Sequence, residues 1–233
     1  MDDFFRPKKA KPTLLSNPKP TSSSSFKQTA NKRNKINNQY ELADVWLELM
    51  EVVVHQILYK RGVYPEGIFM ETEKYNINVM MSEHPVVNDY IQQVLNSVRP
   101  LALSNKIERM DVQLIDKTGR PIERYVFEFV LCDKKIQDSC FYVMESHLRA
   151  VLMKLDGCQS TLKSLDDECS FQILFHTKQS VVDNFRKTEE FDKFPWARAS
   201  DVAEEDEPDD LMPVHSCNTN ALKIQCYVQH RCR

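Results

Sequence analysis

The segments Phe191-Asp-Lys-Phe-Pro-Trp196 and Leu222-Lys-Ile-Gln-Cys-Tyr-Val228, near the end of the chain, decide the fold. In the second segment apolar residues at positions 222, 224, 226 and 228 alternate with polar ones. This period of two predicts a half-buried β-strand, which must join a sheet that earlier residues have built. The acidic run Glu204–Asp210 carries too much like charge to pack, so we expect a solvated loop there. A loop that can close over something lying against the sheet favours a binding protein over a catalyst.

The residues upstream of these segments predict the rest of an α+β domain. Apolar residues recur three and four positions apart, which predicts amphipathic helices over 41–60, 85–98 and 139–155. Gly62 is expected to end the first helix and Pro100 the second. Alternating residues predict strands over 110–115, 122–131 and 171–177, the first two joined as a hairpin with positive φ at Gly119. The expected fold is three helices packed on a mainly antiparallel sheet, within residues 39–233.

Residues 1–38 have a different composition, with four prolines, the serine run 22–25 and few apolar groups. Such a segment cannot bury enough surface to offset its chain entropy, so it is predicted to be a disordered tail. Its short basic clusters, Arg6–Lys11 and Lys32–Lys35, are compatible with nuclear import, and the alternative is solvated linker charge. The nucleus is therefore the expected location, with the cytoplasm as a second one.

The first residues, Met1-Asp-Asp-Phe-Phe5, place two adjacent aromatic residues ahead of the basic cluster. Met1, Phe4 and Phe5 resemble the second half of the peptide motif that docks on the replication sliding clamp. The glutamine that normally precedes this half is missing, so a chance match is the alternative reading. A clamp contact through the tail is thus one hypothesis for these residues.

Charge and composition exclude several classes of function. Of the chain's 31 basic and 34 acidic residues, the tail carries nine and two, which leaves 22 and 32 in residues 39–233. An acidic domain does not suit duplex DNA, so no direct sequence-specific nucleic-acid binding is expected. The seven cysteines show no C-x-x-C spacing, and only four glycines are present, which disfavours zinc sites and phosphate-binding loops. No run of apolar residues is long enough for a membrane span, and no signal-peptide pattern opens the chain.

An enzyme is the rival class, because His55, His84, His147 and His176 accompany the cysteines. No nucleophile elbow or H-E-x-x-H motif is present, and His55 and His147 lie within apolar helical patterns typical of hydrogen-bonded core histidines. A Cys/His pair brought together only in space stays open at this point. We expect no catalytic residues, no metal and no cofactor.

Seven segments, in this order, resemble successive parts of HORMA-domain proteins. They are Glu51–Tyr59, Val63–Phe69, Lys74–Val79, His84-Pro85 with Asn88–Ile91, Arg149-Ala with Leu152 and Lys154, Phe194-Pro-Trp196, and Ile224–Val228. Within that family the likeness is strongest to the branch of small accessory subunits of DNA polymerase zeta. Each segment alone is a weak match, but seven in the same order over residues 40–229 are specific.

The resemblance implies a "safety belt", here about residues 178–233, that wraps over a partner peptide and rejoins the sheet. The peptide adds as an extended strand; in this branch it contains proline and comes from the catalytic subunit of polymerase zeta. Peptide-binding positions of the family fall on Tyr90 and Trp196. For these two residues, helix core and a buried belt anchor are the alternatives.

The resemblance also implies further contacts. The surface that docks the C-terminal domain of a Rev-one type translesion polymerase falls on Leu211, Gln225 and Tyr227, for which an ordinary solvent face is the alternative. Arg149 falls on a contact of HORMA dimers, or else forms a local ion pair. An AAA+ remodeller could grip the N-terminal tail. The implied function is a non-catalytic adaptor in DNA damage tolerance, and the alternative is a HORMA adaptor of the spindle checkpoint or of double-strand-break repair.

Overall fold

A computed structural model describes residues 2–7, 39–131, 138–158, 161–165, 169–189, 196–198, 210–218 and 222–230. Its helices confirm the three that periodicity predicts and add a short fourth one. They are α1 (Gln39–Lys60), α2 (Pro85–Leu103), α3 (Asp138–Cys158) and α4 (Gln179–Phe185). α1 ends at Lys60, two residues before Gly62, whose φ of 62° is open to glycine without a steric penalty.

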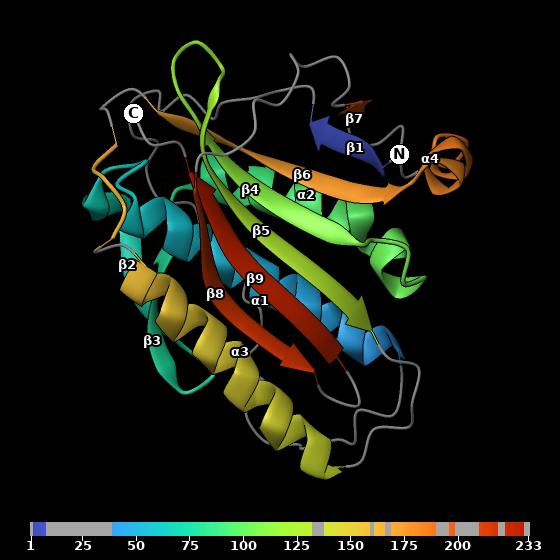
Figure 1. Cartoon of the computed structure of the whole chain (residues 1–233), viewed down its shortest axis with the longest axis horizontal. Helices are drawn as coiled ribbons and strands as arrows, with labels where there is room; N and C mark the ends of the chain where they lie inside the picture. Colours follow the sequence, from blue (N-terminus) through green and yellow to red (C-terminus); the bar gives the residue numbers. More distant parts are fainter. Residues whose placement is uncertain are drawn as a thin grey trace.

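Seven strands form one antiparallel sheet in the order β7-β1-β6-β4-β5-β9-β8 (Figure 1). Their bounds are β1 Asp2–Pro7, β4 Arg109–Ile115, β5 Pro121–Leu131, β6 Ser170–Lys178, β7 Trp196–Arg198, β8 Asp210–Asn218 and β9 Leu222–His230. A separate hairpin pairs β2 (Phe69–Lys74) with β3 (Ile77–Ser82), after a short 3-10 turn over Glu66–Ile68. The predicted β4–β5 hairpin is present, and its Gly119 has a φ of 85°.

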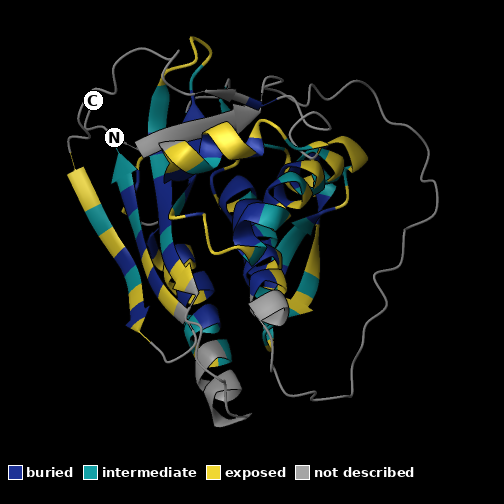
Figure 2. Cartoon of the chain, turned by 90° about the vertical axis from the view of Figure 1, so that its right-hand side faces the viewer, coloured by how far each residue is buried: buried dark blue, intermediate teal, exposed yellow. Residues whose placement is uncertain are grey.

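The core lies between the large sheet and the helices, with α1 at its centre. α1 packs against α2, α3 and the β2–β3 hairpin, so the helices separate the hairpin from the large sheet (Figures 1 and 2). Trp46 of α1 is buried and stacks on Phe129 of β5, with ring centroids 3.9 Å apart. Burial of large side chains of this kind is the main force that holds the layers together.

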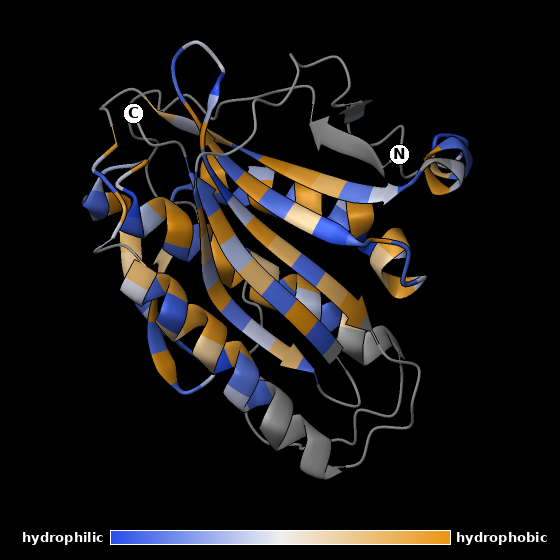
Figure 3. Cartoon of the chain, in the orientation of Figure 1, coloured by the Kyte–Doolittle hydropathy of each residue, from blue (hydrophilic) through white to orange (hydrophobic). Residues whose placement is uncertain are grey.

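Burial alternates along β9, as a strand with one apolar face requires, whereas β4 and β6 are buried on both faces. On β9 the residues Ile224, Cys226 and Val228 are buried, whereas Gln225 is exposed and Tyr227 half-buried. Figure 3 shows the matching alternation of hydrophobic and hydrophilic residues along β5 and β9. The strand predicted from the last segment of the chain is confirmed, and the α+β fold with it. None of the helices in the described ranges is long and apolar enough to cross a membrane.

The structure corrects two predicted boundaries. α2 continues through Pro100 to Leu103, because a proline in the last turn removes only one helical hydrogen bond. The Pro100 carbonyl still accepts a bond from the backbone N–H of Ser104, at 3.2 Å. The acidic loop is also shorter than predicted, since its last residue, Asp210, begins β8; residues 204–209 lie outside the described residues.

The prediction of a disordered tail over residues 1–38 is wrong for residues 2–7, which form β1. A six-residue strand has little stability by itself, and β1 exists because it pairs on one side with β6 and on the other with β7. These partners lie far away in the sequence, so no local pattern could indicate the strand. Residues 8–38 lie outside the described residues.

Candidate functional site: a strand-sized slot between β6 and β7

One edge of the large sheet has the geometry of a slot for an extended chain. β6 is the last long strand on that side, and β7 runs beyond it at a distance that leaves room for β1 between them (Figure 1). β1 pairs antiparallel with β6, from Asp2 opposite Lys178 to Phe5 opposite Phe175. It also pairs antiparallel with β7, from Phe5 opposite Arg198 to Pro7 opposite Trp196. β1 is therefore paired through its main chain on both sides.

The two predicted peptide-binding residues both contact β6. Tyr90 of α2 meets Phe171 edge-to-face, with ring centroids 5.4 Å apart. Trp196 of β7 meets Phe175 in the same manner at 6.0 Å, and it is almost completely buried. Phe171 and Phe175 are four residues apart on one face of β6, which corresponds to about 13–14 Å along the strand. Trp196 thus contacts β6 at Phe175, where the pairing with β1 ends, and Tyr90 contacts it four residues before that point, so a peptide-binding role for either residue stays a prediction.

The aromatic group at the start of β6 is neutral at physiological pH. Tyr64 also packs edge-to-face on Phe171, with centroids 6.3 Å apart. Burial raises the pKa of Tyr90 well above its usual value, and the neighbouring Tyr64 adds to this rise. A phenol that keeps its proton offers an apolar ring with a polar end, which suits a pocket at a binding surface.

The three residues predicted for docking a second polymerase come together on the β8–β9 hairpin. Leu211, Gln225 and Tyr227 line one hollow of about 550 Å³, with Pro213 and Glu128 among its other walls. Leu211 is 52% exposed, so its apolar side chain is open to solvent at the edge of this hollow. Because β8 and β9 are antiparallel, residues far apart in the sequence share one outward face there.

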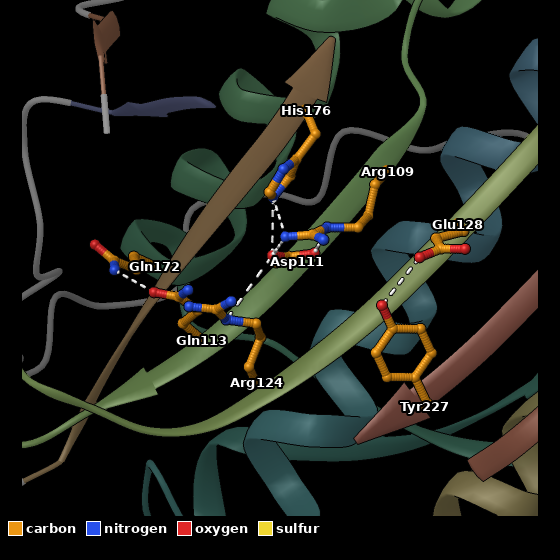
Figure 4. Close-up of polar contacts among 8 residues, drawn as sticks. All are labelled: Arg109, Asp111, Gln113, Arg124, Glu128, Gln172, His176 and Tyr227. Carbon is orange, nitrogen blue, oxygen red and sulfur yellow. Dashed lines mark hydrogen bonds and ion pairs between the residues drawn. The ribbon is translucent and has the colours of Figure 1, made fainter. Parts of the chain in front are cut away.

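Tyr227 is held in place on this face by Glu128 of β5. Its hydroxyl donates to Glu128 Oε1 at 2.9 Å (Figure 4). Partial burial raises the pKa of Tyr227 to about 12, and the bond to the Glu128 carboxylate contributes to the rise. The ring is therefore fixed with its hydroxyl engaged, so it presents a rigid aromatic edge to the hollow. We refer to Leu211, Gln225 and Tyr227 as the hairpin patch.

Arg149 has local partners. Its Nε donates to the Tyr75 carbonyl at 2.8 Å, and its Nη2 lies 3.3 Å from Glu145 Oε1, one turn earlier on α3. These contacts fix α3 against the turn of the β2–β3 hairpin, as the alternative of a local ion pair predicted. A dimer contact through Arg149 stays a prediction. Of the residues proposed for a clamp contact, Met1 lies outside the described residues, and Phe4 and Phe5 lie in β1.

Sequence reasoning missed a polar network on the outer face of the sheet (Figure 4). Asp111 of β4 is completely buried, and its carboxylate lies 2.8 Å from His176 Nε2 and 2.9 Å from Arg109 Nη2. Arg124 of β5 approaches the same carboxylate at 3.9 Å. One carboxylate surrounded by these groups ties β4, β5 and β6 together. Alternation alone predicts an ordinary solvent face here, and the signals in the sequence were an aspartate inside one strand and His176 near the end of another.

One cluster of side chains in the described ranges could hold a metal ion: His147, His215 and Cys217, whose ligand atoms all lie within 4.8 Å of one another. Lys154 Nζ, however, lies 3.2 Å from His215 Nδ1, and a second cation there would be repelled. Burial also raises the pKa of the Cys217 thiol, which disfavours the thiolate that a metal needs. The cluster therefore suits a packing contact between α3 and β8, and the absence of a metal site stays a prediction.

His55 confirms the prediction of a hydrogen-bonded core histidine and makes stability depend on pH. Its Nδ1 accepts the Ser82 backbone N–H at 3.3 Å, and burial lowers its pKa to about 4. Below pH 6.5 the unfolded chain takes up this proton first, so His55 stabilises the fold fully above pH 6.5 and progressively less down to about pH 4. Between pH 7 and 4.5 we expect a loss of roughly 2–3 kcal/mol from this group. Urea denaturation of the wild type and of His55→Asn at both pH values measures it; equal losses in the two proteins would contradict the assignment.

Comparisons with known proteins identify the domain family and the fold. Residues 44–189 match the family model described as the HORMA domain. The chain is 37% identical over 201 residues to the human mitotic spindle assembly checkpoint protein MAD2B. The aligned region covers 85% of this chain and 95% of that protein. It is 27% identical over 203 residues to the DNA polymerase zeta processivity subunit of Arabidopsis thaliana, covering 85% and 90% of the two chains.

Solved structures with low sequence identity share the fold. A chain of the mitotic checkpoint complex superposes with a TM-score of 0.67 at 20% identity, covering 84% of this chain and 97% of that one. C. elegans HTP-2 bound to the HIM-3 closure motif superposes with a TM-score of 0.62 at 10% identity, covering 84% and 93%. At such identities the likeness concerns the fold alone.

Proposed function

The chain belongs to the HORMA-domain family of adaptors, and from this premise we propose that it captures an extended peptide in the slot between β6 and β7. The observation that carries the proposal is the two-sided pairing available in this slot, since β1 is bonded to both strands there. Main-chain hydrogen bonds supply affinity for any extended chain, and pockets beside the strand select side chains. This is a function of binding and needs no catalytic group.

We propose that the peptide comes from the catalytic subunit of DNA polymerase zeta and contains proline. Support comes from similarity to the Arabidopsis processivity subunit and to Drosophila melanogaster DNA polymerase zeta subunit 2, the latter 28% identical over 156 residues. In this proposal Tyr90 and Trp196, whose rings pack on Phe171 and Phe175 of β6, supply the aromatic surfaces against which a proline ring packs. A peptide enclosed between β6 and β7 leaves only when the belt opens, so its release should be slow.

The alternative is a HORMA adaptor of the spindle checkpoint or of double-strand-break repair, in which the same slot takes other peptides. Similarity to the human mitotic spindle assembly checkpoint protein MAD2B supports this alternative. Specificity then depends on which peptide side chains fit beside Tyr90 and Trp196. Comparing the binding of the two classes of peptide distinguishes the alternatives.

The test measures association and dissociation rates of the full chain with two peptides: one proline-containing peptide from a polymerase zeta catalytic subunit and one spindle-checkpoint peptide. We expect the first to bind at submicromolar Kd with release slower than about 0.01 per second, well below the rates of ordinary weak peptide complexes. Binding of the second peptide alone supports the checkpoint alternative. Binding of neither contradicts the proposal.

A second proposed contact is the C-terminal domain of a Rev-one type translesion polymerase on the hairpin patch. The double variant Leu211→Ala/Tyr227→Ala is expected to weaken this contact at least roughly 30-fold, because it removes two central anchors worth about 2 kcal/mol or more. Met70→Ala is the matched control, since Met70 is also 52% exposed but lies on β2, in a different layer. Calorimetry with the isolated polymerase domain measures both; equal effects of the two variants would exclude the hairpin patch.

Three further contacts and the location belong to the same proposal. A HORMA dimer would use α3 near Arg149, an AAA+ remodeller would grip the N-terminal segment, and a sliding clamp would bind Met1, Phe4 and Phe5. Because Phe4 and Phe5 lie in β1, clamp binding requires β1 to leave the slot. The nucleus is the proposed location, supported by the two basic clusters of residues 6–11 and 32–35.

A further inference from the structure

The chain that fills the slot in this structure is its own N-terminal segment. β1 comprises Asp2–Pro7. The strands on its two sides, β6 and β7, come from more than 160 residues later in the sequence. Phe5 is paired on both sides, with Phe175 of β6 and with Arg198 of β7. The segment thus takes the place that the proposed function assigns to a partner peptide.

The slot has room for only one strand. Neighbouring strands in a sheet lie about 4.8 Å apart, so β6 and β7 are separated by about two such spacings with β1 between them. Among the described strands, the three-residue β7 pairs only with β1, so its place in the sheet depends on whichever chain fills the slot. A partner peptide paired with β6 and β7 therefore has to displace β1.

An unoccupied slot would also leave the edge of β6 without hydrogen-bond partners. β6 has nine residues, most of them buried, and without β1 its edge would present unpaired N–H and C=O groups. Such an edge is a template for pairing with other chains and for aggregation. A segment of the same chain that pairs with this edge prevents such association, and a partner peptide that binds more tightly can displace it.

We infer that residues 2–7 are a built-in competitor: they occupy the peptide slot until a partner peptide replaces them. This inference rests on the proposed function of the slot. Residues 8–38 connect β1 covalently to α1, and a tethered competitor acts at an effective concentration on the order of millimolar. The apparent affinity for a partner is reduced by the fraction of time that the slot is free, so a slot free 1% of the time costs about 100-fold.

The test compares Phe5→Pro with the wild type in the full chain. Proline removes the N–H of a residue that is paired on both sides and is excluded from central strands. Ser23→Pro is the matched control, because it adds a proline to the same N-terminal segment outside β1. We expect Phe5→Pro to bind the polymerase peptide at least tenfold more tightly, chiefly through faster association, and Ser23→Pro to behave as the wild type.

Two measurements separate this inference from the proposed function. Hydrogen exchange of the β6 amides without any partner should be faster in Phe5→Pro, and a synthetic peptide of residues 1–12 should restore their protection. Both results support the competitor even if the polymerase peptide binds no variant, an outcome that contradicts only the proposed function. Unchanged β6 exchange together with unchanged peptide affinity overturns the competitor while leaving the slot's function in place. A wild-type dimer that Phe5→Pro dissolves also overturns it, because β1 would then be donated to a second copy.

Discussion

Replacing Arg61 by alanine is expected to lower the free energy of unfolding by about 3–5 kcal/mol, the typical cost of removing one partner of a buried ion pair. The Arg61 side chain is 6% exposed and that of Glu123 is 4% exposed. Arg61 Nε donates to Glu123 Oε2 at 2.9 Å, and Tyr125 donates its hydroxyl to the same oxygen at 3.0 Å. Alanine at position 61 leaves the Glu123 carboxylate buried without its cation. Thermal unfolding measures the effect, expected as a drop of roughly 6–20 °C in Tm.

The exposed pair of Arg99 with Asp44 provides the control. Both of its side chains are nearly half exposed, at 45% and 49%, although their atoms lie as close as 2.7 Å. Arg99→Ala should therefore cost less than about 1 kcal/mol. The double variant Arg61→Ala/Glu123→Leu should recover much of the stability, because it removes the stranded carboxylate as well. If Arg61→Ala costs no more than Arg99→Ala, the buried pair does not hold the end of α1 to β5.

Elements with a strong local pattern could be predicted from the sequence. α1, α2 and α3 each carry apolar residues at helical spacing, and β4, β5 and β9 alternate at period two. Gly62 and Gly119 sit at positive φ, where glycine avoids the clash of a Cβ atom. These features depend on residues close together in the chain, and for that reason sequence alone indicates them.

Elements that depend on distant partners could not be predicted in this way. β8 contains Pro213 and a register shift between Pro213 and His215, so its alternation is broken, and β9 supplies the pairing that makes it a strand. β7 has only three residues and β1 is flanked by a low-complexity segment. Each of these strands gains its stability from the sheet rather than from its own residues.

The candidate site likewise contains residues whose positions follow from local patterns and residues whose positions depend on distant partners. The outward positions of Gln225 and Tyr227 follow from alternation, whereas the hollow they share with Leu211 depends on the pairing of β8 with β9. Trp196 stood out as an aromatic residue after a proline, but its contact with Phe175 depends on closure of the belt. The occupant of the slot, β1, was outside the reach of any local pattern.

Replacing Trp196 by alanine is expected to speed release of the captured peptide by about 100- to 1,000-fold. Trp196 is 2% exposed and packs against Phe175 of β6, so it fastens β7 to the edge of the sheet over the slot. Loss of a buried tryptophan costs about 3–5 kcal/mol, and each 1.4 kcal/mol corresponds to a factor of ten. Because β7 lies at the sheet edge, this loss should favour opening of the belt rather than unfolding of the core. Dissociation of a labelled polymerase peptide, chased with unlabelled peptide, measures the rate.

The chain's other tryptophan is the matched control, because Trp46 is equally buried but lies on α1 and stacks on Phe129 in the middle of the core. Trp46→Ala should lower Tm strongly. Trp196→Ala should keep Tm close to the wild-type value and raise the rate of peptide dissociation. Trp196→Phe keeps an aromatic ring against Phe175 and should release the peptide less than about tenfold faster than the wild type. If Trp196→Ala instead lowers Tm as Trp46→Ala does and leaves the off-rate unchanged, Trp196 stabilises the folded domain and does not hold the belt closed.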